Sequence, residues 1–403
     1  TTEIYPLSLH DALPISCMRL FIILSRVPWP LEKGDKLRAY YQIRELSRYH
    51  DVSLFCLSDT AIDPKAKTEL LRYCKEVHIE RIRRPGILFR LAKAVFSKLP
   101  FQVHYFYKPS LKSKVHSIIR EFNAEHIYCQ LIRCSEYVKN IHHIPKTLDY
   151  MDAFSKGVER RIASAPFGIR SIFKTEARRL VEYENLIFDY FENKTIITEQ
   201  DKRFIYHPDQ QHIHVIPNGV DVTHFSPMER KKKYEIVFNG NMNYPPNIDC
   251  VEYIAKEILP LLPPTTRFLI SGASPAGQVL ELRENSQITV SGWVDDQRES
   301  YASGKVFLAP FRIGTGLQNK LLEAMSMGIP CVTSTLANNA LGAEPGRQIL
   351  IGDSPTEIAD LVAKLLNDKD RAAAIAEEGK SFVHSRYNWE SSCLILNNLI
   401  TGK

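Results

Sequence analysis

A glycine-bearing loop with basic residues on both sides lies in KVFLAPFRIGTGLQNKLLEAMSMGIPCVTS, residues 305–334. Its first residues form an apolar run typical of a buried strand, and the residues after the loop at 314–316 have helical spacing. Backbone N–H groups at the start of a helix attract phosphate, and glycine lets the phosphate approach closely. Because Arg312 and Lys320 bracket the loop, the segment predicts a site where two cations neutralise a diphosphate without a metal ion.

A carboxylate shares the predicted helix with Lys320. Glu323 lies seven residues past Gly316. Its oxygens can accept hydrogen bonds from both hydroxyls of a ribose, so this segment predicts a nucleotide site. The alternative is a plain loop–helix junction with surface charges.

Two further polar loops follow predicted strands. Asn243 lies after the strand YEIVFNG (234–240), and Asp149 and Asp152 lie in TLDYMDAFS (147–155). Open parallel sheets bind ligands at the carboxyl ends of their strands. Asn243 is therefore a candidate ligand contact, with a proline-rich structural turn as the alternative. As an alternative to binding a ligand, Asp149 or Asp152 could cap the helix that follows.

The elements that must position these residues alternate along the chain. Short apolar runs typical of buried strands alternate with helical segments from Met18 onwards, and the alternation resumes at Tyr234. Such alternation indicates α/β layers with parallel sheets and right-handed crossovers. The expected fold class is α/β, with two Rossmann-like domains facing a cleft and MERKKKYE (228–235) as a linker.

Length and composition fit this organisation. The 403 residues are 44% hydrophobic and 24% charged, and the length is about two to three times that of a typical domain. No run reaches the ~20 apolar residues that a transmembrane helix needs. The eight cysteines form no CxxC pair, and no His/Cys cluster has zinc-ligand spacing. We therefore expect reduced thiols, no metal site and a cytoplasmic location.

The first residues differ from the rest of the chain. TTEIYPLSLHDALPIS lacks the basic start and the long apolar core of a secretory signal. It resembles the in-frame translation of a DNA-sequencing adapter. We interpret residues 1–17 as a non-native leader and expect the natural start at Met18, with a short genuine leader as the alternative.

Positive charge is concentrated in the first half of the chain. Residues 18–225 contain 34 Lys and Arg against 24 Asp and Glu, whereas residues 226–403 contain 18 against 20. Residues 81–120 contain ten Lys or Arg and no acidic residue, interleaved with apolar and aromatic residues. This composition favours an anionic membrane surface, and no nucleic-acid motif accompanies it. A solvated helix that covers a core is the alternative.

The ordered set of motifs resembles glycosyltransferases of the GT-B fold, family 4 type. It comprises IPNGVDVTHFSP (216–227), FNGNMNYPPNIDCVEYIAKEILPLL (238–262), SGWVDD (291–296) and the segment at 305–334. SRVPWPLEKGDKLRAYYQI, together with TEARRLVEYE, resembles sugar transferases associated with exosortase-type exopolysaccharide loci. The resemblance extends from Met18 to about Trp389.

The resemblance implies roles for individual residues. Glu323 would bind the ribose of a nucleotide sugar, and Lys320 with Arg312 would bind its phosphates. Members of the family usually have a second glutamate eight residues before Glu323, where this chain has Thr315. Sugar contacts would then come from the backbone of Gly314, Thr315, Gly316 and Leu317.

The resemblance also assigns residues outside this segment. A glycine loop of Gly34, Asp35 and Lys36 would close over the donor, with Asn243 as a further donor contact. Asp152 would position the acceptor hydroxyl.

The same resemblance divides the chain into domains. It places an acceptor-side domain at 18–210, a nucleotide-sugar domain at 211–384, and at 385–403 a helix that crosses back onto the first domain.

The expected function is the transfer of a sugar, with retention of configuration, from a nucleotide sugar to a glycan or lipid-linked acceptor in exopolysaccharide or cell-surface polysaccharide biosynthesis. We expect a nucleotide sugar as the co-substrate. We expect no cofactor, no metal ion and no nucleic-acid partner. Residues 81–120 would bind an anionic membrane on the cytoplasmic side. The alternatives are a nucleotide-sugar 2-epimerase, which needs no acceptor, and a non-catalytic sugar- or lipid-binding protein. A nicotinamide dehydrogenase ranks lower because no GxGxxG follows a strand.

Overall fold

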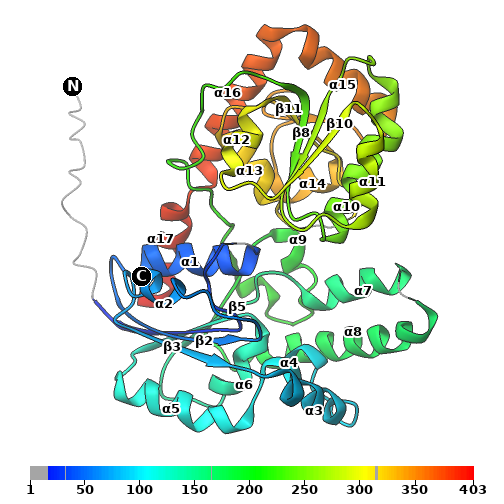
Figure 1. Ribbon diagram of the computed structural model, residues 1–403. Coiled ribbons are helices and arrows are strands. Elements are labelled where there is room, and N and C mark those ends of the chain that lie inside the picture. Colours follow the sequence, from blue (N-terminus) through cyan, green and yellow to red (C-terminus); the bar gives the residue numbers. More distant parts are fainter. Residues whose placement is uncertain (1–16, 32, 165, 314–315) are drawn as a thin grey trace, which may run out of the picture. The chain divides into compact units, whose positions relative to one another are not determined.

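The structure is a computed structural model that describes residues 17–31, 33–164, 166–313 and 316–403. Its strands form two sheets covered by helices (Figure 1). The first has seven strands in the order β3-β2-β1-β4-β5-β6-β7, and the second has six in the order β10-β9-β8-β11-β12-β13. Neighbouring strands from β3 to β6, and all neighbours of the second sheet, run parallel. The predicted α/β fold with two Rossmann-like units is confirmed.

The strands are short. In the first sheet they are β1 (Arg19–Leu24), β2 (Asp51–Ser58), β3 (Glu76–Arg81), β4 (His126–Gln130), β5 (Lys146–Asp149), β6 (Asn193–Ile196) and β7 (Ile213–Val215). In the second they are β8 (Tyr234–Asn239), β9 (Phe268–Ser271), β10 (Ile288–Gly292), β11 (Gly304–Ala309), β12 (Cys331–Thr333) and β13 (Leu350–Ile351). The strand β3 was not predicted, because the alternating charges of EVHIER at a sheet edge do not form an apolar run.

Helices connect these strands. Up to Phe188 they are α1 (Gly34–Leu46), α2 (Ala66–Leu70), α3 (Arg84–Ala94), α4 (Phe101–Phe106), α5 (Lys112–Glu121), α6 (Ser135–Val138), α7 (Phe154–Ser164) and α8 (Phe167–Phe188). Later helices are α9 (Glu199–Lys202), α10 (Pro245–Tyr253), α11 (Gly277–Glu281), α12 (Gln297–Ala302), α13 (Asn319–Ser326), α14 (Thr335–Leu341), α15 (Pro355–Asn367), α16 (Lys369–Arg386) and α17 (Trp389–Thr401). None of the helices in the described part of the chain combines the length and apolar character that a membrane span requires.

The chain divides into two compact units. The first contains the chain up to Met151, residues Ala165–Thr195 and residues Ile395–Lys403. The second contains Asp152–Ser164 and Ile196–Leu394. The boundaries expected at 210 and 384 from the family resemblance stay predictions.

Continuous apolar strands make the core of each unit. In β1 the side chains from Leu20 to Leu24 are at most 1% exposed, as expected for a parallel strand covered on both faces. The corresponding strand β8 buries Ile236, Val237 and Phe238. All eight cysteines are free, and seven of them are buried.

The second half of α17 belongs to the first unit. His50 Nε2 and Asn397 Oδ1 lie 2.7 Å apart, and Asn193 donates a hydrogen bond of 3.0 Å to the carbonyl oxygen of Leu399. Leu396 and Ile400 are buried on the same helix. These contacts hold the second half of α17 against the first unit.

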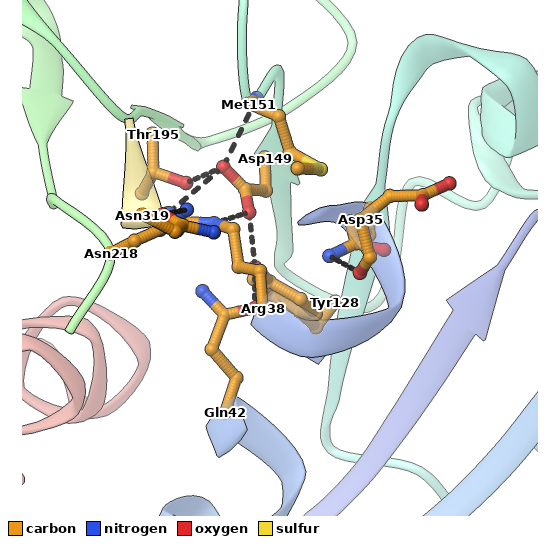
Figure 2. A network of polar contacts seen from close by, with 10 residues as sticks. Asp35, Arg38, Gln42, Tyr128, Asp149, Met151, Thr195, Asn218 and Asn319 are labelled. Atoms are coloured by element: carbon orange, nitrogen blue, oxygen red, sulfur yellow. Dashed lines mark hydrogen bonds and ion pairs between the residues drawn. The ribbon is translucent and has the colours of Figure 1, made fainter. Parts of the chain in front are cut away.

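A buried ion pair fixes α1 to the carboxyl end of β5 (Figure 2). The Arg38 guanidinium donates to both carboxylate oxygens of Asp149, at 2.6 and 3.2 Å, and neither side chain is exposed. Tyr128 donates to the same carboxylate at 2.8 Å and Thr195 at 3.0 Å. The pair therefore joins α1, β4, β5 and β6 in one network, because each of these elements supplies one partner.

We expect Arg38→Met to lower the free energy of unfolding of the first unit by about 3–5 kcal/mol, because it leaves the Asp149 carboxylate buried without its cation. Urea unfolding followed by far-UV circular dichroism measures this loss. Lys75→Ala, which removes an exposed ion pair with Asp51, is the matched control and should change the unfolding midpoint little. Equal midpoints for the two variants would contradict the role assigned to the buried pair.

Candidate functional site

Lys320 lies over two aromatic rings in the second unit. Its Nζ is 4.8 Å from the ring centroid of Phe311 and 5.8 Å from that of Phe238, and it donates a 3.1 Å hydrogen bond to Gln318. The rings come from the end of β8 and from the loop after β11, which are neighbouring parallel strands. A cation held on aromatic faces keeps its charge available for an anionic ligand.

Gly240 makes room for this lysine. A Cβ atom at residue 240 would lie 3.2 Å from Cε of Lys320 and 2.7 Å from Nδ2 of Asn247. A side chain there would displace both groups. The glycine after β8 in the FNG motif is thus required by the close approach of α13.

Burial changes the electrostatics of Lys320. It lowers the pKa of the Lys320 ammonium group to about 8, and the nearby Glu323 carboxylate acts in the opposite direction. A lysine with a lowered pKa gains most from a ligand that brings negative charge, because that ligand replaces the lost hydration.

Glu323 is held by a tyrosine from another helix. The hydroxyl of Tyr301, on α12, donates a 2.6 Å hydrogen bond to Oε2 of Glu323. Burial raises the pKa of Glu323, while the Tyr301 hydrogen bond and Lys320 act to lower it. Lys320 and Glu323 are three residues apart on α13 and therefore share one face of the helix. Their assignment to the phosphates and the ribose of a nucleotide stays a prediction.

Arg312 is placed differently from Lys320. Its guanidinium pairs with Asp249 at 2.8 and 3.2 Å and with Glu257 at 3.1 Å, and it lies 4.2 Å from the ring centroid of Tyr253. All three partners belong to α10 or to the π-helical turn that follows it. In this state the charge of Arg312 is already neutralised by carboxylates, so its assignment to phosphate stays a prediction that requires the side chain to change partners.

The loop after β8 is organised by its own asparagines. Asn247 is buried and donates a 2.9 Å hydrogen bond to the carbonyl oxygen of Asn241, and the Asn241 side chain accepts one from the backbone of Asn243 at 2.9 Å. Asn243 itself is exposed. Asp152 is also exposed, in the same unit, and is one of the charges that influence the pKa of Tyr244 beside Asn243. Burial is the main cause that raises this pKa.

The predicted glycine loop of the first unit forms the start of α1. Gly34 is the first helical residue, Lys36 follows in the first turn, and the Asp35 carboxylate accepts a hydrogen bond from Arg26. Gln130, at the end of β4, donates a 3.2 Å hydrogen bond to the carbonyl oxygen of Asp35. The loop is thus tied to the carboxyl ends of β1 and β4.

Two of the predicted contacts, Gly314 and Thr315, lie outside the described residues. Gly316 and Leu317 lead into α13, and Leu317 packs against the core of the second unit. In the described part of the chain, no group of three or more His, Cys, Asp or Glu side chains could hold a metal ion. Metal-independent activity stays a prediction.

Sequence reasoning missed the partners of the predicted residues. Tyr301 is 22 positions from Glu323, and no pattern connects them. Phe238 and Phe311 have the spacing of core residues, and nothing in their sequence context indicates that a lysine lies on them. Asp249 and Glu257 could only be linked to Arg312 through the packing of α10.

Comparison with known proteins finds a family match within the second unit. Residues 233–368 match the family model described as glycosyl transferases group 1. A Klebsiella pneumoniae protein described as an uncharacterized 44.6 kDa protein in the cps region is 23% identical over 393 residues, covering 92% of this chain and 96% of that protein. The chain therefore carries a glycosyltransferase domain and is a glycosyltransferase.

Two further relatives agree with this. A GDP-mannose-dependent alpha-(1-6)-phosphatidylinositol monomannoside mannosyltransferase of Mycobacterium tuberculosis is 28% identical over 222 residues, covering 46% of this chain and 55% of that enzyme. The crystal structure of HepE from Anabaena in complex with UDP and glucose matches with a TM-score of 0.69 at 15% identity, covering 95% of this chain and 99% of HepE. The second match shows the fold, which is GT-B.

If Lys320 contacts the phosphates as predicted, its lowered pKa should make nucleotide binding depend on pH. Below about pH 8 the ammonium group is charged, and this charge is lost as the pH rises through that value. An anionic ligand favours the charged form, so the affinity for a nucleoside diphosphate should fall by up to about tenfold per pH unit above pH 8. Titration calorimetry at pH 7, 8 and 9 measures the change.

Lys320→Arg is the matched control, because arginine stays protonated throughout this range. Its affinity should be nearly constant between pH 7 and 9. Parallel pH profiles for the wild type and Lys320→Arg would show that Lys320 does not contact the phosphates.

Proposed function

We propose that this glycosyltransferase moves a sugar, with retention of configuration, from a nucleotide sugar to a lipid-linked glycan of a cell-surface or extracellular polysaccharide. The observation that carries the proposal is the pair Lys320 and Glu323 on one face of α13 at the carboxyl edge of β8 and β11. The polysaccharide context is supported by the relative in the Klebsiella pneumoniae cps region. The lipid-linked acceptor is supported by the phosphatidylinositol mannoside that the mycobacterial relative uses according to its name.

In the proposed reaction the bond between the sugar C1 and the diphosphate oxygen breaks, and its electron pair leaves with the nucleoside diphosphate. Lys320 stabilises the negative charge that develops there, which is the usual largest contribution of an enzyme to such transfers. Glu323 holds the ribose hydroxyls and Tyr301 orients Glu323. The acceptor hydroxyl, positioned by Asp152, forms the new bond to C1 on the same face, and its proton passes to the departing phosphate oxygen.

We expect the full chain to bind one nucleoside diphosphate saturably and to hydrolyse the corresponding nucleotide sugar slowly when no acceptor is present. Calorimetry with a panel of nucleoside diphosphates, followed by incubation with their sugars, identifies the donor. Glu323→Ala should weaken binding of the diphosphate at least about tenfold, because charge-assisted hydrogen bonds to the ribose are lost. Tyr301→Phe should weaken it less.

Glu344→Ala is the control for charge, since Glu344 is an exposed glutamate of the same unit. It should bind like the wild type. An epimerised sugar as the product, or binding that Glu323→Ala leaves unchanged, would contradict the proposal.

The membrane part of the proposal rests on an exposed surface of the first unit. Leu88, Phe89 and Phe96, on and just after α3, are 67%, 63% and 95% exposed, whereas Ile87 and Phe106 of the same segment are buried. The segment 81–120 is therefore divided between a core-facing side and an unusually apolar outer side. The exposed basic residues around this outer side are Arg83, Arg84, Lys93 and Lys98.

The start of α8 has a similar composition of exposed residues. Ile169 and Ile172 are 45% and 52% exposed, and they are interleaved with the exposed Arg170 and Lys174. The two helices are fixed to each other because Arg179 of α8 donates hydrogen bonds of 2.8 and 3.1 Å to the carbonyl oxygens of Ala94 and Val95. Basic side chains beside exposed apolar ones fit an anionic bilayer.

We expect the protein to sediment with phosphatidylglycerol vesicles, to be released by salt, and to bind phosphatidylcholine vesicles weakly. Leu88→Ser should lower the bound fraction several-fold, because the side chain would no longer enter the bilayer. Leu71→Ser is the matched control, since Leu71 is a 44% exposed leucine of the same unit at the end of α2. Equal binding to both vesicle types, or equal loss in both variants, would refute the membrane role of this surface.

A further inference from the structure

Charged residues follow the carboxyl ends of four neighbouring strands in the first unit. Arg84 begins α3 soon after β3, Asp59 follows β2, Arg26 follows β1 and Arg133 follows β4. These strands are adjacent in the sheet in the order β3-β2-β1-β4 and run parallel. Their carboxyl ends therefore form one edge, which in open α/β sheets is where ligands bind. Three of the four residues are arginines.

The short helix α4 is packed against this edge. Tyr105 donates a 2.8 Å hydrogen bond to Asp59, and Gln102 accepts hydrogen bonds of 2.7 and 3.1 Å from Arg133. The ring of Phe106 is shared by two cations, because the guanidinium carbon of Arg133 lies 5.2 Å and that of Arg26 5.9 Å from its centroid. Two arginines from neighbouring strands are thus gathered around one aromatic side chain.

Positive charge exceeds negative charge along this edge. Asp35 pairs with Arg26, and Asp59 is hydrogen-bonded to the neutral Tyr105. Arg90 of α3 adds a further cation, which donates hydrogen bonds of 3.0 and 2.8 Å to the carbonyl oxygens of His104 and Tyr105 in α4. At the other end of α4, Glu176 and Arg179 offset each other in charge.

We propose that this edge binds a phosphate group of the acceptor, with Arg133 as its main ligand and Arg26, which keeps its ion pair with Asp35, as a second cation beside it. Guanidinium groups present paired N–H donors that match phosphate oxygens, and an anion between them relieves the repulsion of the gathered cations. The inference deepens the proposed function and rests on it, since a lipid-linked glycan carries phosphate between its lipid and its sugar. The helix α3, whose exposed outer side we assign to the membrane, packs on α4, so this edge and the membrane surface are connected through α4.

The test measures binding of farnesyl phosphate to the full chain while a saturating nucleoside diphosphate occupies the second unit. Arg133→Gln should weaken this binding at least tenfold, and Arg133→Lys should restore part of it. Arg120→Gln is the matched control, because it removes one exposed arginine of the same unit from α5. Binding of the nucleoside diphosphate and the melting temperature check that each variant is folded.

Two further ligands distinguish affinity for the phosphate group from affinity for the hydrocarbon chain. Inorganic phosphate should compete with farnesyl phosphate in the wild type and not in Arg133→Gln, whereas farnesol should bind wild type and variant equally and weakly. Farnesyl phosphate binding that Arg133→Gln and Arg120→Gln lower to the same extent would overturn the site and leave only a general charge effect. Failure to bind any nucleoside diphosphate would count against the proposed function and not against this edge.

Discussion

Parallel strands in one sheet bring every connection at their carboxyl ends to a common edge, and this constraint determines where chemistry can occur in the protein. In the second unit, β8 and β11 are neighbours, so the loop that contains Gly240 and the loop that contains Arg312 meet beside α13. In the first unit, the same constraint collects Arg26, Asp59 and Arg133 at the edge that α4 covers. Residues far apart in sequence become neighbours because the strands before them are paired.

Lys320 and Arg312 show that the residues around a cation decide whether it is available to bind an anionic ligand. Lys320 rests on aromatic rings and has a lowered pKa, so a ligand that brings negative charge stabilises it. Arg312 already has two carboxylates, and giving them up for a phosphate would leave Asp249 and Glu257 without their cation. Phosphate binding by Arg312 therefore has an energetic cost that phosphate binding by Lys320 does not have. The sequence predicts the same role for both residues, and only the packing of α10 makes their surroundings different.

Much of the fold could be predicted from the sequence, because buried parallel strands are continuous apolar runs and the helices between them have a clear period. The pair Lys320 and Glu323 could also be predicted, since a spacing of three on a helix brings side chains to one face. Their partners could not, because Tyr301 reaches Glu323 through the packing of a separate helix. The exposure of Leu88 and Phe96 could not be predicted either, since a helix that covers a core and a helix that binds a bilayer have similar compositions.

The helix α4 connects the two surfaces of the first unit that we assign to the acceptor. On one side it packs against α3, whose outer residues are apolar and basic. On the other side Tyr105 and Phe106 contact the residues that follow β2, β1 and β4. A lipid-linked phosphate likewise has an anion next to its hydrocarbon. The apolar surface of α3 and the arginines at the strand edge, joined by α4, therefore match the hydrocarbon and the phosphate of such an acceptor, and a site for a free sugar would require neither.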